Sequence, residues 1–190
     1  SITSSSSVAC TDARARAMAP RKALSVSQWA DAHRKVSTKQ SPKAGDWKTA
    51  SNPPLGEPMD CMSTRHPARD IVLKFPIQFG KTEIAINAVG YGMDHAPGPT
   101  MVALPGEVSM HKWVAQKLNP MLEETPAVRA LLSSTASRDG ANRREFKDFA
   151  GGQLFIEHAG SPSRLKSTTV ERLVVDELDE FADQLTSGDD

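Results

Sequence analysis

The sequence has few of the residues that mark secreted, zinc-binding or membrane proteins. Its two cysteines, Cys10 and Cys61, are too few for a disulfide framework and too far apart for a local metal-binding pair. The five histidines are scattered and form no His-Glu-x-x-His motif, which argues against a structural zinc site. No apolar run approaches the ~20 residues that span a bilayer, and the first seven residues lack the basic and apolar parts of a signal peptide. We therefore expect reduced thiols in a cytoplasmic protein without a membrane partner.

Neither sign of charge is in excess, because 23 Lys and Arg residues balance 23 Asp and Glu residues. The balance hides an asymmetry, since residues 1–50 carry +6 and residues 171–190 carry −7. A basic amino-terminal segment can attract nucleic acid through its phosphates, or it can be a disordered, solvated leader. The sequence predicts a basic, partly disordered arm with a short helix over residues 1–45, and one domain over residues 46–190.

What the sequence does contain is a candidate phosphate-binding loop. The apolar run 71–75 leads into a turn, and Gly80-Lys81-Thr82 then opens a segment with a helical pattern. The N–H groups at a helix N-terminus attract phosphate, and a glycine lets the backbone approach it closely. In a P-loop of this kind, Lys81 would contact the β- and γ-phosphates of a nucleotide and the Thr82 hydroxyl would bind Mg²⁺.

A second apolar run, residues 172–175, ends in two adjacent carboxylates, Asp176 and Glu177. As in a Walker B motif, Asp176 would hold Mg²⁺ through water, and Glu177 would orient and polarise the attacking water. Asp176 lies 95 positions beyond Lys81, which leaves room for the strand and helix units of a parallel sheet. Ligands bind at the carboxyl ends of strands in such sheets, so the two motifs together predict a nucleotide site.

The loop is not a complete Walker A motif. The first glycine of G-x-x-x-x-G-K-[ST] would fall at position 75, which is Phe75 and is followed by Pro76. The alternative interpretation is that Gly80-Lys81-Thr82 forms a solvated turn. The paired carboxylates downstream favour the nucleotide site.

Four segments resemble the large subunit of phage terminases, the DNA-packaging motors, in the lambda-like GpA family. They are LSVSQWAD at 24–31, EPMD at 57–60, QFGKTE at 78–83 with Asn87 after it, and VVDELDEF at 174–181. The resemblance implies an α/β fold, a three-layer P-loop NTPase sandwich of the additional-strand type with a mostly parallel sheet. It implies ATP and Mg²⁺ as cofactors in a motor that moves double-stranded viral DNA into a procapsid. It also implies the small terminase subunit, the portal and further copies of the chain as partners, in the host cytoplasm.

By motif match, the resemblance assigns functional roles to eight residues. It assigns nucleotide binding to Gln78, Phe79, Gly80, Lys81, Thr82 and Glu83, catalysis to Lys81 and Glu177, and metal binding to Thr82 and Asp176. Many terminases carry an arginine where this chain has Gln78, so an arginine finger would have to come from elsewhere, such as a neighbouring subunit. The run Asn52-Pro-Pro-Leu55 stands where the family often has a tyrosine near the adenine, which leaves the base contact open.

Family members continue beyond the Walker B strand into a metal-dependent nuclease domain. The sequence stops at Asp190. We therefore expect an ATPase domain truncated after the Walker B strand, without nuclease activity.

The apolar patterns predict helices that alternate with strands. Ser25 or Ser27 would cap a helix that buries Trp29, and the helix after the loop would bury Ile84, Ala88 and Tyr91. The remaining predicted elements are strands at 71–75, 100–104 and 173–175, a hairpin or two short strands at 147–149 and 153–157, helices at 107–118 and 127–132, and a polar linker at 37–58.

These residues are compatible with three functions: a terminase motor, a helicase-like P-loop nucleic-acid ATPase, and a non-catalytic remnant or assembly module. The Ser, Arg and Lys residues of segment 161–167 would contact DNA, present Arg164 to a phosphate, or form an ordinary polar loop. Arg138, Arg143 and Arg144 are further candidates for an arginine finger that acts on a neighbouring subunit.

Overall fold

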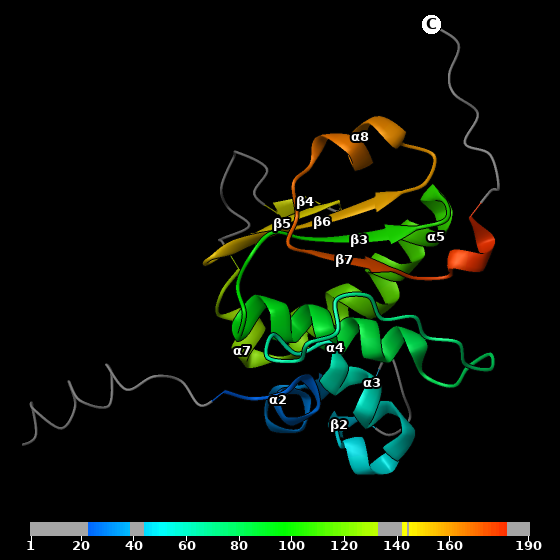
Figure 1. Ribbon diagram of the computed structural model, residues 1–190. Helices are drawn as coiled ribbons and strands as arrows, with labels where there is room; N and C mark the ends of the chain where they lie inside the picture. Colours follow the sequence, from blue (N-terminus) through cyan, green and yellow to red (C-terminus); the bar gives the residue numbers. More distant parts are fainter. Residues whose placement is uncertain (1–22, 39–43, 133–141, 144, 182–190) are drawn as a thin grey trace, which may run out of the picture.

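The centre of the molecule is a five-stranded mixed sheet with the order β4-β5-β6-β3-β7 (Figure 1). The computed structural model describes residues 23–38, 44–132, 142–143 and 145–181. The sheet strands are β3 (Thr100–Leu104), β4 (Asn142–Arg143), β5 (Phe146–Phe149), β6 (Gly152–His158) and β7 (Arg172–Val175). Strands β6, β3 and β7 run parallel to one another, whereas β5 runs antiparallel to both of its neighbours, β4 and β6. The predicted α/β class is confirmed, and half of the sheet's pairings are parallel.

Helices lie on both faces of this sheet. In Figure 1, α8 (Pro162–Ser167) lies above the sheet and α4 (Lys81–Asp94) runs below it, with α2 and α3 beneath α4. The other helical elements are α2 (Val26–His33), α3 (Gly56–Cys61), α5 (Glu107–Trp113), the π-helical η3 (Val114–Leu118), α6 (Asn119–Glu124) and α7 (Pro126–Arg129), with 3₁₀ turns η1 (Thr49–Ser51), η2 (Pro53–Leu55) and η4 (Leu178–Glu180). A small antiparallel pair, β1 (Lys35–Val36) and β2 (Gly45–Asp46), completes the set.

The start of α2 is fixed by a capping box, as Ser25 predicts. The Ser25 hydroxyl accepts a hydrogen bond from the Gln28 N–H, and the Gln28 side chain accepts one from the Ser25 N–H. Trp29 is fully buried, and its indole N–H donates to Asp94 at 2.8 Å. A Cβ at Gly90 would lie 2.4 Å from the Trp29 ring, so α2 and α4 approach this closely only because residue 90 is glycine. Trp29 is therefore the core anchor between the two helices.

The helix α4 is the main covering element of the core. It ends at Asp94, before His95-Ala-Pro-Gly-Pro99, because prolines cannot continue a helix. Ile84 and Tyr91 are buried as the sequence predicts, and Ala88 is half-buried. Asn87, which belongs to the quoted terminase-like motif, is buried too and donates to the Met59 sulfur at 3.4 Å. That contact ties α4 to α3.

Most of the other predicted elements are confirmed. The strand at 100–104, the hairpin β5–β6 and the strand β7 all form, and the helical pattern at 107–118 becomes α5 followed by η3. The predicted helix 127–132 is shorter and begins earlier, at Pro126. Segment 161–167 is not the loop that we expected, because Pro162–Ser167 is helical.

The predicted strand at 71–75 is not formed. Its side chains alternate between half-buried and exposed, with Val72 87% exposed and Leu73 and Phe75 packed on the core, so the segment is extended. A strand needs a neighbour for its backbone hydrogen bonds. Within the described residues, no segment pairs with the outer edge of β7, so residues 71–75 do not join the sheet there and lack the ladder hydrogen bonds of a strand.

The predicted polar linker at 37–58 is wrong over most of its described part. Residues 45–58 contain β2, η1, η2 and the first residues of α3, and Leu55 is buried. The prediction was wrong because the segment, although mostly polar, contains a few apolar residues that pack against the core beside α4. The division of the chain at residue 45 stays a prediction, although α2, from the predicted arm, packs directly on α3 and α4.

Candidate nucleotide site

The candidate loop leads directly into the N-terminus of α4. Gly80 precedes the helix with φ +109°, a left-handed conformation that favours glycine, and no side chain caps the first turn. Gln78 also has a positive φ, +59°. An uncapped 14-residue helix presents backbone N–H groups and a partial positive charge at this end. The loop thus has the local geometry of an anion site.

Residues 52–55 pack against the candidate phosphate-binding loop. The Asn52 side-chain amide donates to the Phe79 carbonyl at 3.3 Å. A Cβ at position 80 would meet Leu55 at 3.0 Å, so Gly80 lies directly on that side chain. The Phe75 and Phe79 rings are in contact, with centroids 5.1 Å apart. The run from Asn52 to Leu55 therefore holds the loop in place.

Asp176 immediately follows β7 and is held by hydrogen bonds to both carboxylate oxygens. Its own N–H donates to the Ala103 carbonyl of β3, which continues the parallel pairing. The Trp113 indole N–H donates to Oδ2 at 3.1 Å, and the Glu177 N–H donates to Oδ1 at 3.1 Å. Asp176 is only 7% exposed. These two donors fix the orientation of the carboxylate, which is the group type that holds the metal in a Walker B motif.

Glu177 is in a strained backbone conformation next to this carboxylate. Its φ is +56°, and Gln78 and Glu177 are the only non-glycine residues with positive φ in the described ranges. Left-handed φ in such residues costs about 1–2 kcal/mol, and such strain clusters at functional sites. Partial burial raises the pKa of Glu177, and the nearby Glu180, Asp176 and Asp179 raise it further, while Lys112 opposes them. A raised pKa suits a residue that accepts a proton.

A pocket of about 330 Å³ brings parts of the two motifs together. Thr82 of α4 and Glu177 after β7 both line it, as does Leu104 at the carboxyl end of β3. The arrows of β3 and β7 point toward this end of the sheet in Figure 1. The rest of the lining comes from helical segments: Ser109, Lys112, Trp113, Gln116, Lys117 and Glu180. Lys81, Asp176 and residues 78–80 do not line the pocket, and Asp176 is linked to it through Trp113 and Glu177.

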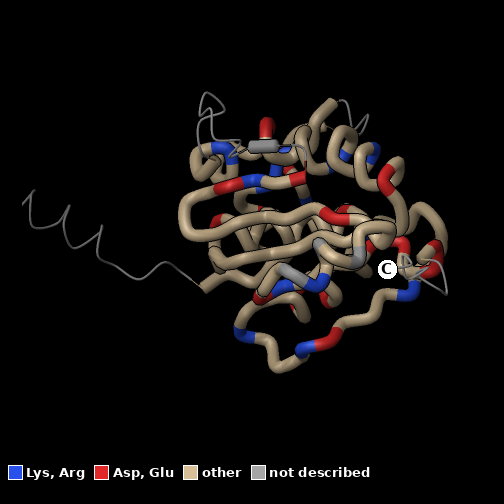
Figure 2. The backbone as a smooth tube through the Cα atoms, turned by 90° about the horizontal axis from the view of Figure 1, so that it is seen from above, with Lys and Arg blue, Asp and Glu red and all other residues tan. Residues whose placement is uncertain are grey.

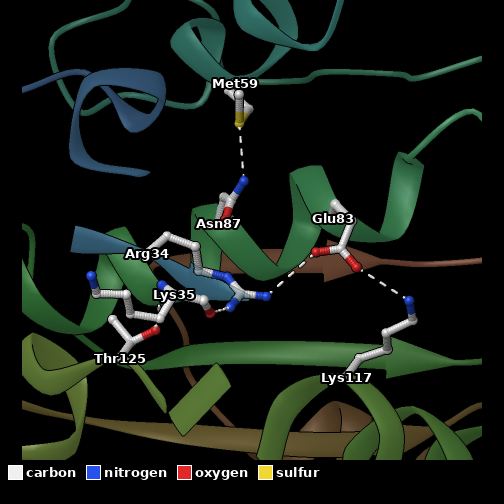
Figure 3. A network of polar contacts seen from close by, with 7 residues as sticks. All are labelled: Arg34, Lys35, Met59, Glu83, Asn87, Lys117 and Thr125. Atoms are coloured by element: carbon white, nitrogen blue, oxygen red, sulfur yellow. Dashed lines mark hydrogen bonds and ion pairs between the residues drawn. The ribbon is translucent and has the colours of Figure 1, made fainter. Parts of the chain in front are cut away.

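The Glu83 carboxylate is paired with two cations. Oε2 lies 3.4 Å from the Arg34 guanidinium and Oε1 lies 3.1 Å from the Lys117 ammonium, and Figure 3 shows Glu83 between them. The Arg34 side chain is fully buried and also donates to the Lys35 carbonyl. Burial lowers the pKa of Arg34, and Glu83 opposes that shift. Glu83, predicted to bind the nucleotide, thus joins the start of α4 to Arg34 and Lys117.

Four residues of this arrangement were not found by reasoning from the sequence: Arg34, Lys112, Trp113 and Lys117. The apolar residues of the helix at 107–118 have mixed periodicity, so its buried face could not be read from the sequence. Of the arginine-finger candidates, Arg138 and Arg144 lie outside the described residues. Arg143 and Arg164 lie in β4 and α8, and nothing is described of their side chains. Positions of both charge signs are interspersed over the described backbone (Figure 2).

A family model described as the phage terminase large subunit gpA, ATPase domain, matches residues 41–190. The chain belongs to this terminase family. Comparisons with curated proteins and with solved structures give no significant match. The match covers both candidate motifs and begins after α2. Membership of the terminase family shows an ATPase domain, and it confirms the resemblance drawn from the four sequence segments. In the described part of the chain, no helix is both long enough and apolar enough to cross a membrane.

The residues present fit a magnesium-bound nucleotide. Mg²⁺ prefers oxygen ligands and is usually held by one or two protein groups plus water and phosphate. Thr82 carries a hydroxyl and Asp176 a carboxylate, which are oxygen groups of this kind, and the described residues contain no cluster of three or more His, Cys, Asp or Glu that would hold a metal alone. The pocket volume lies at the lower end of the range for small-molecule sites.

Proposed function

We propose that this domain is the ATPase motor of viral DNA packaging, which hydrolyses Mg-ATP to translocate double-stranded DNA into a procapsid. The observation that carries the proposal is the shared pocket of Thr82 and Glu177. These residues belong to motifs 95 positions apart in sequence, and the fold places them at one end of a parallel strand pair. The terminase family supports the DNA-packaging context.

Each proposed site residue has a role that follows from its chemistry. Lys81 and the N–H groups that open α4 hold the phosphates, with Gln78, Phe79 and Gly80 shaping the loop and Glu83 fixing the first turn. Thr82 and Asp176 hold Mg²⁺, which when bound neutralises phosphate charge. Glu177 orients a water and accepts its proton. We further propose the three-layer, additional-strand P-loop sandwich as the complete fold.

The proposed partners are double-stranded viral DNA, the small terminase subunit, the procapsid portal and further copies of the chain. The proposed location is the host cytoplasm, with transient binding at the portal. These proposals rest on the family alone. The nuclease activity of longer family members has no candidate residues in our proposal.

Calorimetric titration with Mg-ATP tests the nucleotide site. We expect saturable binding by the unaltered chain and loss of binding in Lys81→Ala, because its charge-assisted phosphate contact is removed. Glu177→Gln should bind Mg-ATP but not hydrolyse it, since an amide is not a base. Binding by Lys81→Ala that matched the unaltered chain would show that the loop assignment is wrong. DNA packaging with a procapsid separates a terminase motor from a helicase-like ATPase.

A non-catalytic assembly module is the second candidate. It is favoured by one observation, that Lys81 does not line the pocket in which Thr82 and Glu177 meet. A folded chain that failed to bind Mg-ATP would support this alternative.

A further inference from the structure

One face of the α5–η3 segment forms a polar wall of the candidate nucleotide pocket. Ser109, Lys112, Trp113, Gln116 and Lys117 all line the pocket. Their spacing of three and four residues places them on the same face of a helix. The segment becomes π-helical at Val114–Leu118, and π turns within helices occur frequently at functional sites. Two lysines therefore line the same space as Thr82 and Glu177.

Lys117 is held at the first turn of the candidate P-loop helix. Its ammonium lies 3.1 Å from Glu83 Oε1, and Glu83 is the residue after Thr82. Glu83 is itself held by the buried Arg34. A cation from a separate segment is thus positioned at the helix end where the phosphates of a nucleotide would bind (Figure 3).

We propose that Lys117 is a further phosphate-contacting residue of the nucleotide site and supplies, from the same chain, positive charge that Gln78 does not supply. This inference rests on the proposed function. A lysine ammonium is a compact charge on a flexible four-carbon stem, so it can exchange a carboxylate oxygen for a phosphate oxygen. Glu83 holds the ammonium close to the site until a polyphosphate enters. Lys112 adds a second positive charge on the same wall, next to Glu177.

The ion pair with Glu83 does not by itself account for a lysine at position 117. The Lys117 side chain is 35% exposed and Glu83 is 22% exposed. Partly solvated Lys–Glu pairs contribute little to stability. The placement of Lys117 in the pocket wall beside Thr82 is explained better by a ligand that carries negative charge.

Calorimetry with three nucleotides tests the proposal. Lys117→Met should weaken Mg-ATP binding by about tenfold or more, the size expected for a lost charge-assisted hydrogen bond. The loss should be smaller for Mg-ADP and absent for AMP, because fewer phosphates lie within reach. Lys117→Arg should recover most of the Mg-ATP affinity. Lys48→Met, at an exposed lysine outside the pocket, is the matched control and should bind as the unaltered chain does.

A second measurement needs no variant and so does not depend on one folding. Partial acetylation of the unaltered chain, followed by mass spectrometry, should show that Mg-ATP protects Lys117 but not Lys48. Unprotected Lys117, or Lys117→Met with Mg-ATP affinity within twofold of the unaltered chain, would overturn the proposal while leaving the proposed function intact. An equal loss of ATP and AMP binding would also overturn it. Failure of the unaltered, folded chain to bind Mg-ATP would overturn both.

Discussion

The hydrogen bond between the Trp113 indole and Asp176 should contribute measurably to stability, and its energy can be isolated. The bond is 3.1 Å long, and each residue is 7% exposed. A hydrogen bond to a charged acceptor contributes about 1.5–3 kcal/mol net. Trp113→Phe removes the donor and also part of the ring, so the single variant loses more than the bond alone.

A double-mutant cycle separates the bond from the lost ring volume. We would measure the free energy of unfolding of the unaltered chain, Trp113→Phe, Asp176→Ala and the double variant by urea denaturation followed by far-ultraviolet circular dichroism. The expected coupling energy is about 2 kcal/mol, because each single variant leaves one buried polar atom, Asp176 Oδ2 or the Trp113 indole nitrogen, without its partner.

A second indole in the chain offers a matched control. Trp47 donates to the neutral Thr49 hydroxyl at the same distance of 3.1 Å, and it is only half-buried. The Trp47→Phe and Thr49→Ala cycle should give a coupling of about 1 kcal/mol or less. If the Trp113–Asp176 coupling fell below about 0.5 kcal/mol, within the usual error of additivity, our account of Asp176 as a carboxylate held in place by the indole would be refuted.

Three further changes should lower the free energy of unfolding, each measured by urea denaturation. Gly90→Ala should cost about 1–3 kcal/mol through overpacking, because the new Cβ would lie 2.4 Å from Trp29. Glu83→Gln should cost about 3 kcal/mol, because it leaves the buried Arg34 guanidinium without its carboxylate. Ser25→Ala should cost about 1 kcal/mol, because the capping box at the start of α2 loses its hydroxyl acceptor.

Each of these variants has a control in the chain. Gly106→Ala adds a Cβ with nothing within 4 Å, so it should cost only about 0.5 kcal/mol, from the change of the N-cap residue of α5. Lys117→Met removes only the partly solvated ion pair between Lys117 and Glu83, so it should lower the free energy of unfolding by about 1 kcal/mol or less. Ser27→Ala, two positions after the true cap, should lower the free energy of unfolding by less than Ser25→Ala does. Equal losses within any pair would contradict the contact invoked for it.

Local signals in the sequence predicted much of the fold. The serine before Val26, the prolines after Asp94 and the apolar runs of β3 and β7 each act within a few residues, so they predict an element without knowledge of its neighbours. The same applies to the two motifs of the candidate site. A glycine before a helix and carboxylates after a strand are local patterns, both motifs lie within the family match, and the roles of their residues stay predictions.

The pairing of residues 71–75 could not be decided locally. Their alternation of buried and exposed side chains is that of a strand, yet a strand also needs a hydrogen-bonded neighbour, and that depends on the order of the whole sheet. For residues 45–58 the prediction was wrong in the opposite sense, because structure formed where none was expected. Their polar composition predicted a linker, and a few buried contacts such as Leu55 against Gly80 were enough to fold them.

The amino-acid sequence by itself determined where the two motifs stand, how α2 and α4 begin and end, and which residues we propose for phosphate and metal binding. The tertiary structure decided what surrounds them. Arg34 comes from the end of α2, and Trp113 and Lys117 come from α5–η3. They reach the candidate site only because these two segments are placed beside the start of α4 and the end of β7. Contacts between residues so far apart in sequence depend on the packing of whole elements, which leaves no local pattern in the chain.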